Sequence, residues 1–531
     1  MANLFKDLAR GLRQGIAGLG RVNPSEEVMQ DFLPEYQKEL GGMREYALEI
    51  QSKARAGDPD SVFALASEYM TGGWLRANPV KAARWMRRAA EMGHAVGQML
   101  FASMCSTGTG VPKDDVAAAR WMHAAAEQGS SNAGLALAEL YDAGIGVPQD
   151  FEKAAYWNMK AALSGNAQAQ GALGLRLVLG NGVPQDYNSA VHWLMKAADQ
   201  GDAEAQYNLG AICGNGKGVP ENQAEAANLF RKAAEQGHAK AQFALGKSYY
   251  YGRGVAEDTV KAVLWLSMAA NQGNADAQAL LGAFCATGDG LPKDLVKASV
   301  WFQQAAAQGH AAAQHELGLM FFKGQGGPQD YGESAAWLSK AAKQGYPAAQ
   351  FHLGACYADG LGVTMDKTLA AAWIRKAADQ GYAEAQWTLG GLYSNGLGLQ
   401  KDDGEAAIWI RKAAEQDHAE AQAVLGYLHY KGQGVTQDYA ETVAWVRKAA
   451  EKGNALARAF LGELYEKGDG VPQSYADAHF WLDLSATGLD GAQLTETLKS
   501  RDRCARKLTP AALSKVRKRV AKWRTDHPEQ P

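Results

Sequence analysis

Hydrophobic and polar positions along this chain repeat with a period of 36 residues. Residues 418–453 read HAEAQAVLGYLHYKGQGVTQDYAETVAWVRKAAEKG, and the preceding 36 residues follow the same pattern with different surface residues. Within each period, apolar residues recur at the three- and four-residue spacing of an amphipathic helix, in two runs separated by a glycine-containing stretch. Twelve periods run from about Asp58 to Gly488. The sequence therefore predicts twelve stacked helix-turn-helix repeats that form one elongated, all-α body.

Two fixed places in each repeat mark the ends of its predicted second helix. The residue after this helix is usually glycine, which adopts the left-handed conformation at little steric cost. These residues are Gly57, Gly93, Gly129, Gly165, Gly201, Gly237, Gly273, Gly309, Gly345, Gly381, Asp417, Gly453 and Gly488. The residue before the helix is Asp, Asn or Ser, whose side chain accepts a backbone N–H of the first turn. Because these acids recur once per repeat and cannot converge, we interpret them as helix caps.

Small and large residues alternate inside the predicted helices. In nine repeats a glycine follows the central leucine of the first helix, as in Leu425-Gly426. Glycine inside a helix costs about 1 kcal/mol relative to alanine, so we expect the second helix to pass close to it. Eleven second helices carry a tryptophan, and in ten of them Ala-Ala follows four residues later, as in Trp445, Ala449 and Ala450. This spacing places them on one face and predicts a core that continues between repeats.

The composition and motifs of the chain give no indication of several common classes of binding or catalytic site. A net charge of −3 over 531 residues gives no attraction of the whole molecule to nucleic acid or membrane. The five cysteines are far apart in sequence, which predicts reduced thiols in a cytoplasmic protein and no disulfide framework. The G-x-G loops lack the strand or the Lys-Ser/Thr that phosphate sites need. Histidines such as His238 and His418 open separate repeats, so we expect no metal, no cofactor and no catalytic constellation.

The two ends of the chain differ from the repeats. Residues 1–42 contain an amphipathic pattern, which we interpret as a variable or capping segment, with a membrane-surface or partner-docking helix as the alternative. The solenoid is predicted over 43–488, beginning with a half-repeat cap at 43–57. Residues 489–531 are strongly basic and predict C-terminal capping helices. Contact with nucleic acid or acidic lipid through 499–531 is the alternative.

The repeated motif A-x-x-x-L-G-x-x-Y-x-x-G-x-G-V-x-x-D-x-x-K-A-x-x-W-x-x-K-A-A-x-x-G resembles the Sel-1-like repeat (SLR), a relative of the tetratricopeptide repeat. The matching residues in the eleventh repeat are Ala421, Leu425, Gly426, Gly432, Gly434, Val435, Asp438, Trp445, Lys448, Ala449, Ala450 and Gly453. The resemblance covers about four-fifths of the chain. It implies an α/α right-handed superhelical solenoid. It also implies a non-enzymatic scaffold or adaptor that binds a protein or peptide on its concave face, with bacterial roles in secretion, the envelope or signalling.

Some cysteine-rich bacterial relatives resemble β-lactamases in activity, which makes a hydrolase the rival class. Those relatives carry a disulfide in each repeat. This chain has single cysteines, and Cys105, Cys213 and Cys285 occupy a slot held by tyrosine in other repeats. No Ser-x-x-Lys motif stands in a suitable context. We therefore predict that the chain is not an enzyme.

Residues that do not repeat are the candidates for partner binding. By analogy with tetratricopeptide repeats, the first helices line the concave side, and the variable positions flank the Leu-Gly and tyrosine slots. Aromatic and basic residues gather there, and such side chains dominate binding energy at interfaces. The candidates are Tyr207, Phe243, Lys247, Tyr250, His315, Phe322, Phe351, Trp387, Tyr427 and Tyr430. The alternative is that these rings pack between neighbouring first helices.

Overall fold

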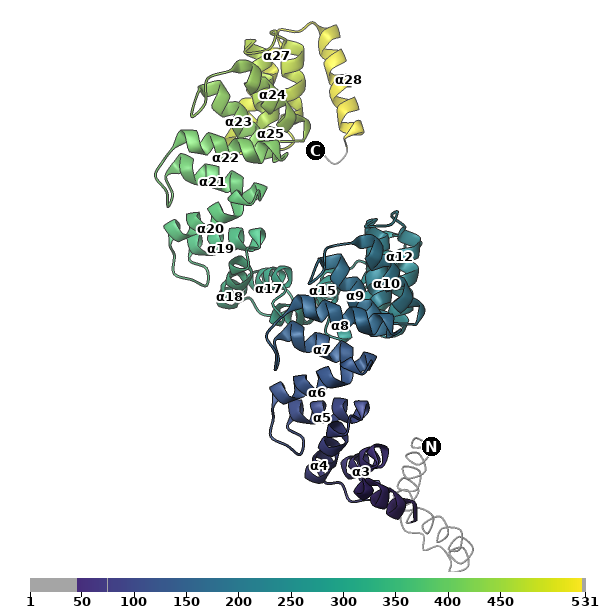
Figure 1. Ribbon diagram of the computed structural model, residues 1–531. Coiled ribbons are helices and arrows are strands. Elements are labelled where there is room, and N and C mark those ends of the chain that lie inside the picture. Colours follow the sequence, from purple (N-terminus) through teal and green to yellow (C-terminus); the bar gives the residue numbers. More distant parts are fainter. Residues whose placement is uncertain (1–44, 74, 528–531) are drawn as a thin grey trace, which may run out of the picture. The chain divides into compact units, whose positions relative to one another are not determined.

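The computed structural model describes residues 45–73 and 75–527, and all regular structure within them is helical (Figure 1). Each repeat contributes a first and a second helix joined by a glycine-containing loop, which confirms the predicted all-α solenoid of helix-turn-helix repeats. The segment predicted over 1–42 lies outside the described residues. The described part of the half-repeat cap, 45–56, is helical, and its Ala54 packs against Val62 and Leu65 of the first repeat.

Packing divides the chain into two bodies, Met1–Ala241 with Arg253–Val255, and Gln242–Gly252 with Ala256–Pro531. The division falls in α13 (Ala239–Tyr251). The first body contains α3 (Pro59–Thr71), α4 (Pro79–Glu91), α5 (Ala95–Thr107), α6 (Asp115–Glu127), α7 (Ser131–Ala143), α8 (Phe151–Leu163), α9 (Ala167–Leu179), α10 (Tyr187–Asp199), α11 (Ala203–Asn215) and α12 (Gln223–Glu235).

The second body continues the same alternation of first and second helices. It contains α14 (Thr259–Asn271), α15 (Ala275–Thr287), α16 (Leu295–Ala307), α17 (Ala311–Lys323), α18 (Tyr331–Lys343), α19 (Pro347–Asp359), α20 (Lys367–Asp379), α21 (Ala383–Asn395), α22 (Asp403–Glu415), α23 (Ala419–Lys431), α24 (Tyr439–Glu451), α25 (Ala455–Lys467) and α26 (Tyr475–Ser485). Two further helices, α27 (Gly491–Ala505) and α28 (Pro510–Asp526), follow the last repeat.

The predicted capping residues begin and end these helices. Asp438 accepts hydrogen bonds from the backbone N–H groups of Ala440 and Glu441 at the start of α24. Gly453 after α24 has a φ of 95°, and Asp417 adopts the same left-handed conformation with a φ of 70°. Gly488 is an exception that corrects the prediction: α26 ends earlier, at Ser485, and Gly488 is absent from the left-handed set. A side chain at Gly488 would instead collide with Ala455, so its role is close packing.

The glycine after the central leucine is where the two helices of a repeat meet. A Cβ added at Gly174 would lie 2.6 Å from Leu194 Cγ of the second helix, and one at Gly210 would lie 2.8 Å from Phe230 Cε1. Such distances are far below van der Waals contact. The close approach expected from the sequence is therefore confirmed, and it offsets the low helix propensity of glycine.

The tryptophans of the second helices pack between repeats. Trp157, Trp409, Trp445 and Trp481 are buried, whereas the other described members are half-buried. In six repeats a lysine three residues later lies over the tryptophan ring, and the ammonium of Lys412 lies 3.8 Å from the Trp409 ring centroid. The stripe is therefore core, and the lysine supplies a cation–π contact as well as a charge near the helix C-terminus.

A ladder of glutamines links consecutive repeats. In the fourth position of the first helix, Gln314 donates through Nε2 to the Ala306 carbonyl at 3.0 Å, and its Oε1 accepts from Gln344 Nε2 at 2.8 Å. The side-chain bond to the glutamine 30 residues later recurs at Gln98, Gln170, Gln206, Gln242, Gln278, Gln350 and Gln386. Sequence reasoning missed this ladder, although its members are buried polar groups that need partners.

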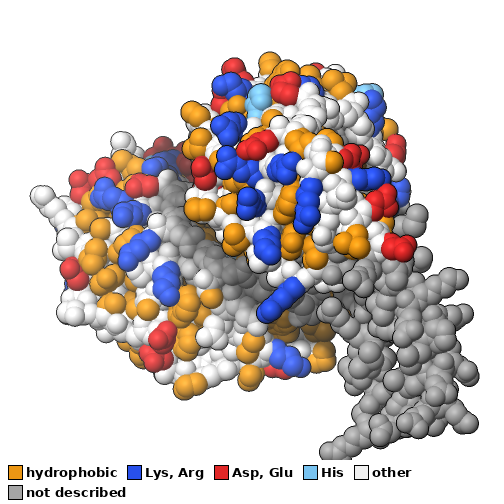
Figure 2. Space-filling view, turned by 60° about the horizontal axis from the view of Figure 1, so that its bottom comes forward, with side chains coloured by type: hydrophobic (Ala, Val, Ile, Leu, Met, Phe, Trp, Pro, Cys, Tyr) orange, Lys and Arg blue, Asp and Glu red, His pale blue; other side chains and the backbone are white. Residues whose placement is uncertain are grey.

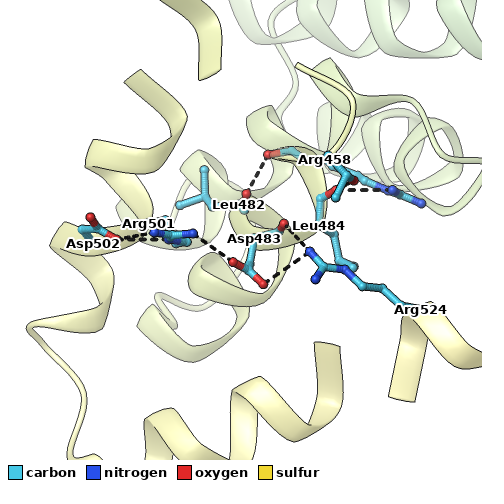
Figure 3. Close-up of polar contacts among 9 residues, drawn as sticks. Arg458, Leu482, Asp483, Leu484, Arg501, Asp502 and Arg524 are labelled. Carbon is cyan, nitrogen blue, oxygen red and sulfur yellow. Dashed lines mark hydrogen bonds and ion pairs between the residues drawn. The ribbon is translucent and has the colours of Figure 1, made fainter. Parts of the chain in front are cut away.

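The ladder ends at the C-terminus with arginine in place of glutamine. Arg458 is 1% exposed; its Nε donates to the Ala450 carbonyl at 3.0 Å and its Nη1 to the Leu484 carbonyl at 3.4 Å. Figure 3 shows Arg458, Arg501 and Arg524 converging on the C-terminal end of α26, where Arg501 and Arg524 pair with Asp483. These cations sit at the negative end of the α26 dipole, and the ion pairs of Arg501 and Arg524 hold α27 and α28 on the last repeat.

Candidate functional site

The ten candidate residues fall into two sets according to their place on the first helix. Five lie at its fifth position, one residue after the ladder glutamine. They are Tyr207, Phe243, His315, Phe351 and Trp387. The others lie further along, at the ninth and twelfth positions, and we call them the first-helix row. The row consists of Lys247, Tyr250, Phe322, Tyr427 and Tyr430. Tyr207 belongs to the first body, and the other nine residues belong to the second.

Fifth-position rings contact the residue that opens the next first helix. Trp387 lies 5.5 Å from His418 between ring centroids, and Phe351 lies 5.7 Å from Tyr382. Tyr207 makes the same contact with His238 at 5.2 Å. These rings are half-buried and join neighbouring first helices, which is the alternative that the sequence left open. Part of the surface of these rings therefore packs within the stack and part stays exposed.

The histidines that open repeats serve as helix caps, as predicted. His418 Nδ1 accepts a hydrogen bond from the backbone N–H of Ala421 at 3.3 Å, and its Nε2 lies 3.3 Å from a carboxylate oxygen of Glu384 in the preceding repeat. His238 repeats the arrangement with Ala241 and Glu204. Accepting at Nδ1 places the proton of a neutral ring on Nε2, where it can be donated to the carboxylate.

His315 is buried among polar groups and is not part of an open surface. Its side chain is 5% exposed, its Nδ1 lies 3.1 Å from Glu316, and its Nε2 lies 3.2 Å from His352 Nδ1. The hydrogen bond from His315 holds the pKa of Glu316 below its usual range. Burial lowers the pKa of His352, so that this ring stays neutral more readily. The cluster joins α17 to α19, and we leave His315 out of the proposed binding surface.

In the first-helix row Tyr427 is exposed, and the other four members are half-buried. Tyr250 donates its hydroxyl to Asp289 at 2.6 Å, and this bond to a carboxylate is the main cause of its raised pKa. Phe322 packs edge to face on Tyr331 at 5.3 Å between ring centroids. Both rings are half-buried. The phenol of Tyr250 is therefore held in one orientation by the next repeat, so it presents a pre-organised edge.

The second aromatic group of the row consists of Tyr427 and Tyr430 on α23, and Phe460 on α25 packs against both. Tyr427 is 46% exposed, and Tyr430 packs edge to face on Phe460 at 5.3 Å. Lys431 lies over both tyrosines, with its ammonium 5.7 Å from the Tyr427 centroid and 5.5 Å from the Tyr430 centroid. Tyr430 also donates to Asp469 at 3.2 Å, and burial is the main cause of its raised pKa. The group combines a large exposed ring with a fixed cation, as binding hot spots do.

Small residues occupy the same positions on α19 and α21, the first helices between these aromatic groups. They are Ala355 and Ala358 on α19, and Gly391 and Ser394 on α21. A Cβ added at Gly391 would meet no atom within 4 Å. The row therefore alternates between large aromatic and small residues along the second body, and Gly391 faces open space.

Charge on the surface is mixed. On the face that Figure 2 shows, basic and acidic side chains are interspersed with hydrophobic ones. Within 45–73 and 75–527, no group of three or more His, Cys, Asp or Glu side chains is arranged to hold a metal ion. No helix in those ranges is both long and apolar enough to cross a bilayer.

Comparison with known proteins agrees with the geometry of the repeats. The Sel1 repeat matches residues 59–94, 95–130, 131–166, 167–202, 203–238, 239–274, 275–310, 311–346, 347–382, 383–418, 419–454 and 455–488. No curated protein sequence matches the chain.

Solved structures give the same result. One is c5321, a protective antigen of uropathogenic Escherichia coli that displays an SLR fold. It is 32% identical over 89% of this chain and 97% of its own, with a TM-score of 0.67. Another is a Sel1 repeat protein from Oxalobacter formigenes, 34% identical over 58% of this chain and 89% of its own, with a TM-score of 0.47. With its twelve consecutive matches, this chain belongs to the Sel1 repeat family.

Proposed function

We propose that this protein is a non-enzymatic scaffold that binds a protein or peptide on the concave face formed by its first helices. Sel1 repeat proteins generally act as scaffolds for protein interactions. The proposal is supported by the different roles of the repeated and the variable residues. The repeated residues cap helices, pack closely or form the glutamine ladder, whereas the residues of the first-helix row vary between repeats. The row keeps exposed aromatic surface, such as that of Tyr427, which is 46% exposed.

The row suits a peptide with large apolar side chains. Tyr250 and Phe322 stand at one end and Tyr427 and Tyr430 at the other, with the small residues of α19 and α21 between them. An apolar side chain over Gly391 would enter space that no protein atom fills. Aromatic anchors that flank such space are the usual source of binding energy in peptide grooves. We infer a bacterial role in secretion, the envelope or signalling from the c5321 similarity and the family resemblance alone.

A capture experiment with the full chain tests the proposal. Tyr427→Ala with Tyr430→Ala should remove partners that the wild type retains, because alanine removes the exposed ring and the platform beneath it. The matched control is Leu264→Ala with Ile408→Ala, which truncates exposed apolar side chains on second helices. Quantitative mass spectrometry of the retained proteins gives the result. Equal retention by the wild type and the tyrosine variant, with equal thermal unfolding, would refute binding through this row.

We propose that the hydrolase class does not apply to this chain. Sel1 repeat solenoids are generally non-catalytic. The cysteines Cys105, Cys285 and Cys356 are buried and unpaired, and burial raises the pKa of each thiol, which keeps it protonated and unreactive. Turnover of the chromogenic β-lactam nitrocefin by the purified full chain would contradict this assignment.

We also propose a cytoplasmic location, supported by free thiols of this kind. Cell fractionation tests it: the chain should appear with cytosolic markers, and recovery with periplasmic or extracellular markers would overturn it.

A further inference from the structure

The basic residues after the last repeat separate into a paired group and an unpaired group. Arg501, Arg503, Arg519 and Arg524 form ion pairs with acids of α25, α26 and α27. A second group makes no side-chain hydrogen bond or ion pair with any described residue, and all its members are exposed. It consists of Lys515, Arg517, Lys518 and Lys522 on α28, which we call the α28 basic face, and of Arg506 and Lys507 just before that helix. The first group is structural, whereas the four cations on α28 have no ion-pair partner among the described residues.

The packed side of α28 explains this division. Val516 and Val520 are buried against Phe480 and Trp481 of α26. Arg519 borders that side, where its guanidinium lies 3.9 Å from the Phe480 centroid. With the inner side fixed in this way, the helix turns its remaining cations outward. The only acidic residue within α28 is Asp526, at its last position, so the outer side carries positive charge without internal compensation.

A shallow hollow runs along one flank of this basic face. It is lined by Pro510, Leu513, Ser514, Arg517, Lys518 and Ala521 and is open to solvent. These residues follow the spacing i, i+3, i+4, i+7, i+8 and i+11, which is a straight stripe on an α-helix about 16 Å long. Around the helix, Leu513 and Lys518 lie at the two edges of the stripe, and Arg517, Ala521 and Ser514 lie between them. Small residues such as Ser514 and Ala521 let another backbone approach closely, as they do in helix–helix seams.

From this geometry we propose that the outer flank of α28 binds an acidic amphipathic helix of a protein partner. Its apolar side chains lie in the hollow over Leu513 and Ala521, and its carboxylates lie against Arg517, Lys518 and the neighbouring lysines. Charge complementarity requires an acidic partner, because the four cations of the α28 basic face lack acidic partners among the described residues. The straight helical stripe sets its shape, since helices dock through anchors at this spacing.

Nucleic acid and anionic membrane are the competing partners, and the surface fits them less well. Single-stranded nucleic acid binds through stacking on exposed aromatic rings, but the one aromatic residue of α28, Trp523, packs against Phe480, Trp481 and His527. Membrane-surface helices insert large apolar side chains. The α28 flank has only the half-buried Leu513, which lies in a hollow.

Fluorescence anisotropy with the full chain tests the proposal. The probe is a labelled helical peptide of about 20 residues, with leucines on one face and glutamates elsewhere. A second peptide has the same composition but shuffled leucines. The amphipathic peptide should bind at least about tenfold more tightly than the shuffled one, and its affinity should fall as salt rises from about 0.05 to 0.3 M.

Two variants separate the contributions of charge and shape. Lys515→Gln with Lys518→Gln and Lys522→Gln should weaken peptide binding at least about tenfold. Ala521→Trp should also abolish it by filling the hollow, although it leaves every cation in place. The matched charge control, Lys113→Gln with Lys153→Gln and Lys297→Gln, should bind as the wild type does. Substitutions in the first-helix row should not affect this peptide, so the two surfaces can fail separately.

Three outcomes would overturn the proposal. Equal affinity for the amphipathic and shuffled peptides would show that charge alone acts. Unchanged peptide binding by Ala521→Trp, with unchanged unfolding, would exclude the hollow. Tighter binding of a DNA duplex, or of phosphatidylcholine vesicles containing about 30% phosphatidylserine, that is lost in the triple lysine variant would assign the face to that partner instead.

Discussion

Replacing Gln314 by methionine removes one rung of the glutamine ladder while keeping the length of the side chain. Gln314 is 4% exposed, so both of its hydrogen bonds are shielded from water. The Ala306 carbonyl loses the Nε2 donor but still accepts the backbone N–H of Gly309 at 3.0 Å. The loss there is one buried hydrogen bond, about 1 kcal/mol. Gln344 is exposed and can form a hydrogen bond with water instead, so the loss of its bond to Gln314 costs less free energy. We expect a total destabilisation of about 1–2 kcal/mol.

Substitution of Gln344, the hydrogen-bond partner of Gln314, destabilises the chain for a different physical reason. Gln344→Met leaves Gln314 Oε1 buried without a donor, which costs about 1–3 kcal/mol. The double variant should cost little more than Gln314→Met alone, because the second change then removes a bond that no longer exists. The two sites should therefore show a coupling energy of about 1–3 kcal/mol in a double-mutant cycle, close to the cost of Gln344→Met alone. Gln304→Met, on the exposed side of α16, is the matched control and should be neutral.

Urea unfolding of the full chain followed by circular dichroism measures these differences. Repeat proteins can unfold in parts, so amide hydrogen exchange in α17 and α18 gives the local reading. Exchange there should accelerate in both single variants, and amides of the first body should be unaffected. Wild-type unfolding of Gln314→Met, or strictly additive effects in the double variant, would refute the ladder as a source of stability between repeats.

Three further predictions follow from single contacts. Gly134→Ala should stabilise the chain by about 0.5–1 kcal/mol, because its Cβ would meet Ala161 Cβ at an ordinary 3.4 Å. Gly174→Ala should destabilise it through the collision with Leu194, and urea unfolding compares the two. Gln422 has a buried Oε1 without a hydrogen-bond partner, and Lys452 stands 30 residues later, where the ladder has glutamine in other repeats. Asp417→Gly with Lys452→Gln should therefore melt above either single variant, since the Asp417–Lys452 ion pair is lost once while a glycine cap and a rung to Gln422 are gained. His352 has a lowered pKa in the fold, so stability should fall as pH drops below about 6.5, the ordinary histidine pKa. His352→Gln should flatten the melting temperature against pH between about 7 and 5.5, and an unchanged slope would contradict this assignment.

The period of the chain predicts most of the fold because each repeated residue has a local task. Caps such as Asp438 and packing glycines such as Gly174 act within one repeat or on its partner helix, and their spacing reveals them. The glutamine ladder joins two repeats, and its signal in the sequence is a pair of glutamines 30 residues apart. That pair is lost together where Gly134 and Ser164 replace it. Such a joint departure could have revealed the ladder.

The site was less predictable, since exposure depends on the neighbouring repeat. His315 and Trp387 occupy equivalent positions, but His352 lies beside His315 and the ring becomes buried. The basic tail divides in the same way. Arg519 forms an ion pair with Asp477, whereas Lys518, one residue earlier, has no ion-pair partner among the described residues. These differences arise from packing between elements far apart in sequence, which residue type and spacing do not encode.

The most direct test of the scaffold function fills the open space in the first-helix row. Gly391→Trp places a ring where an added Cβ meets no atom within 4 Å, and Gly391→Ala is its matched control. Both should fold as well as the wild type, because alanine and tryptophan have higher helix propensity than glycine. The measurement is the amount of each captured partner retained by the two variants. The scaffold account predicts that Gly391→Ala retains the wild-type partners and Gly391→Trp loses them. Equal retention by both variants would contradict binding on this face.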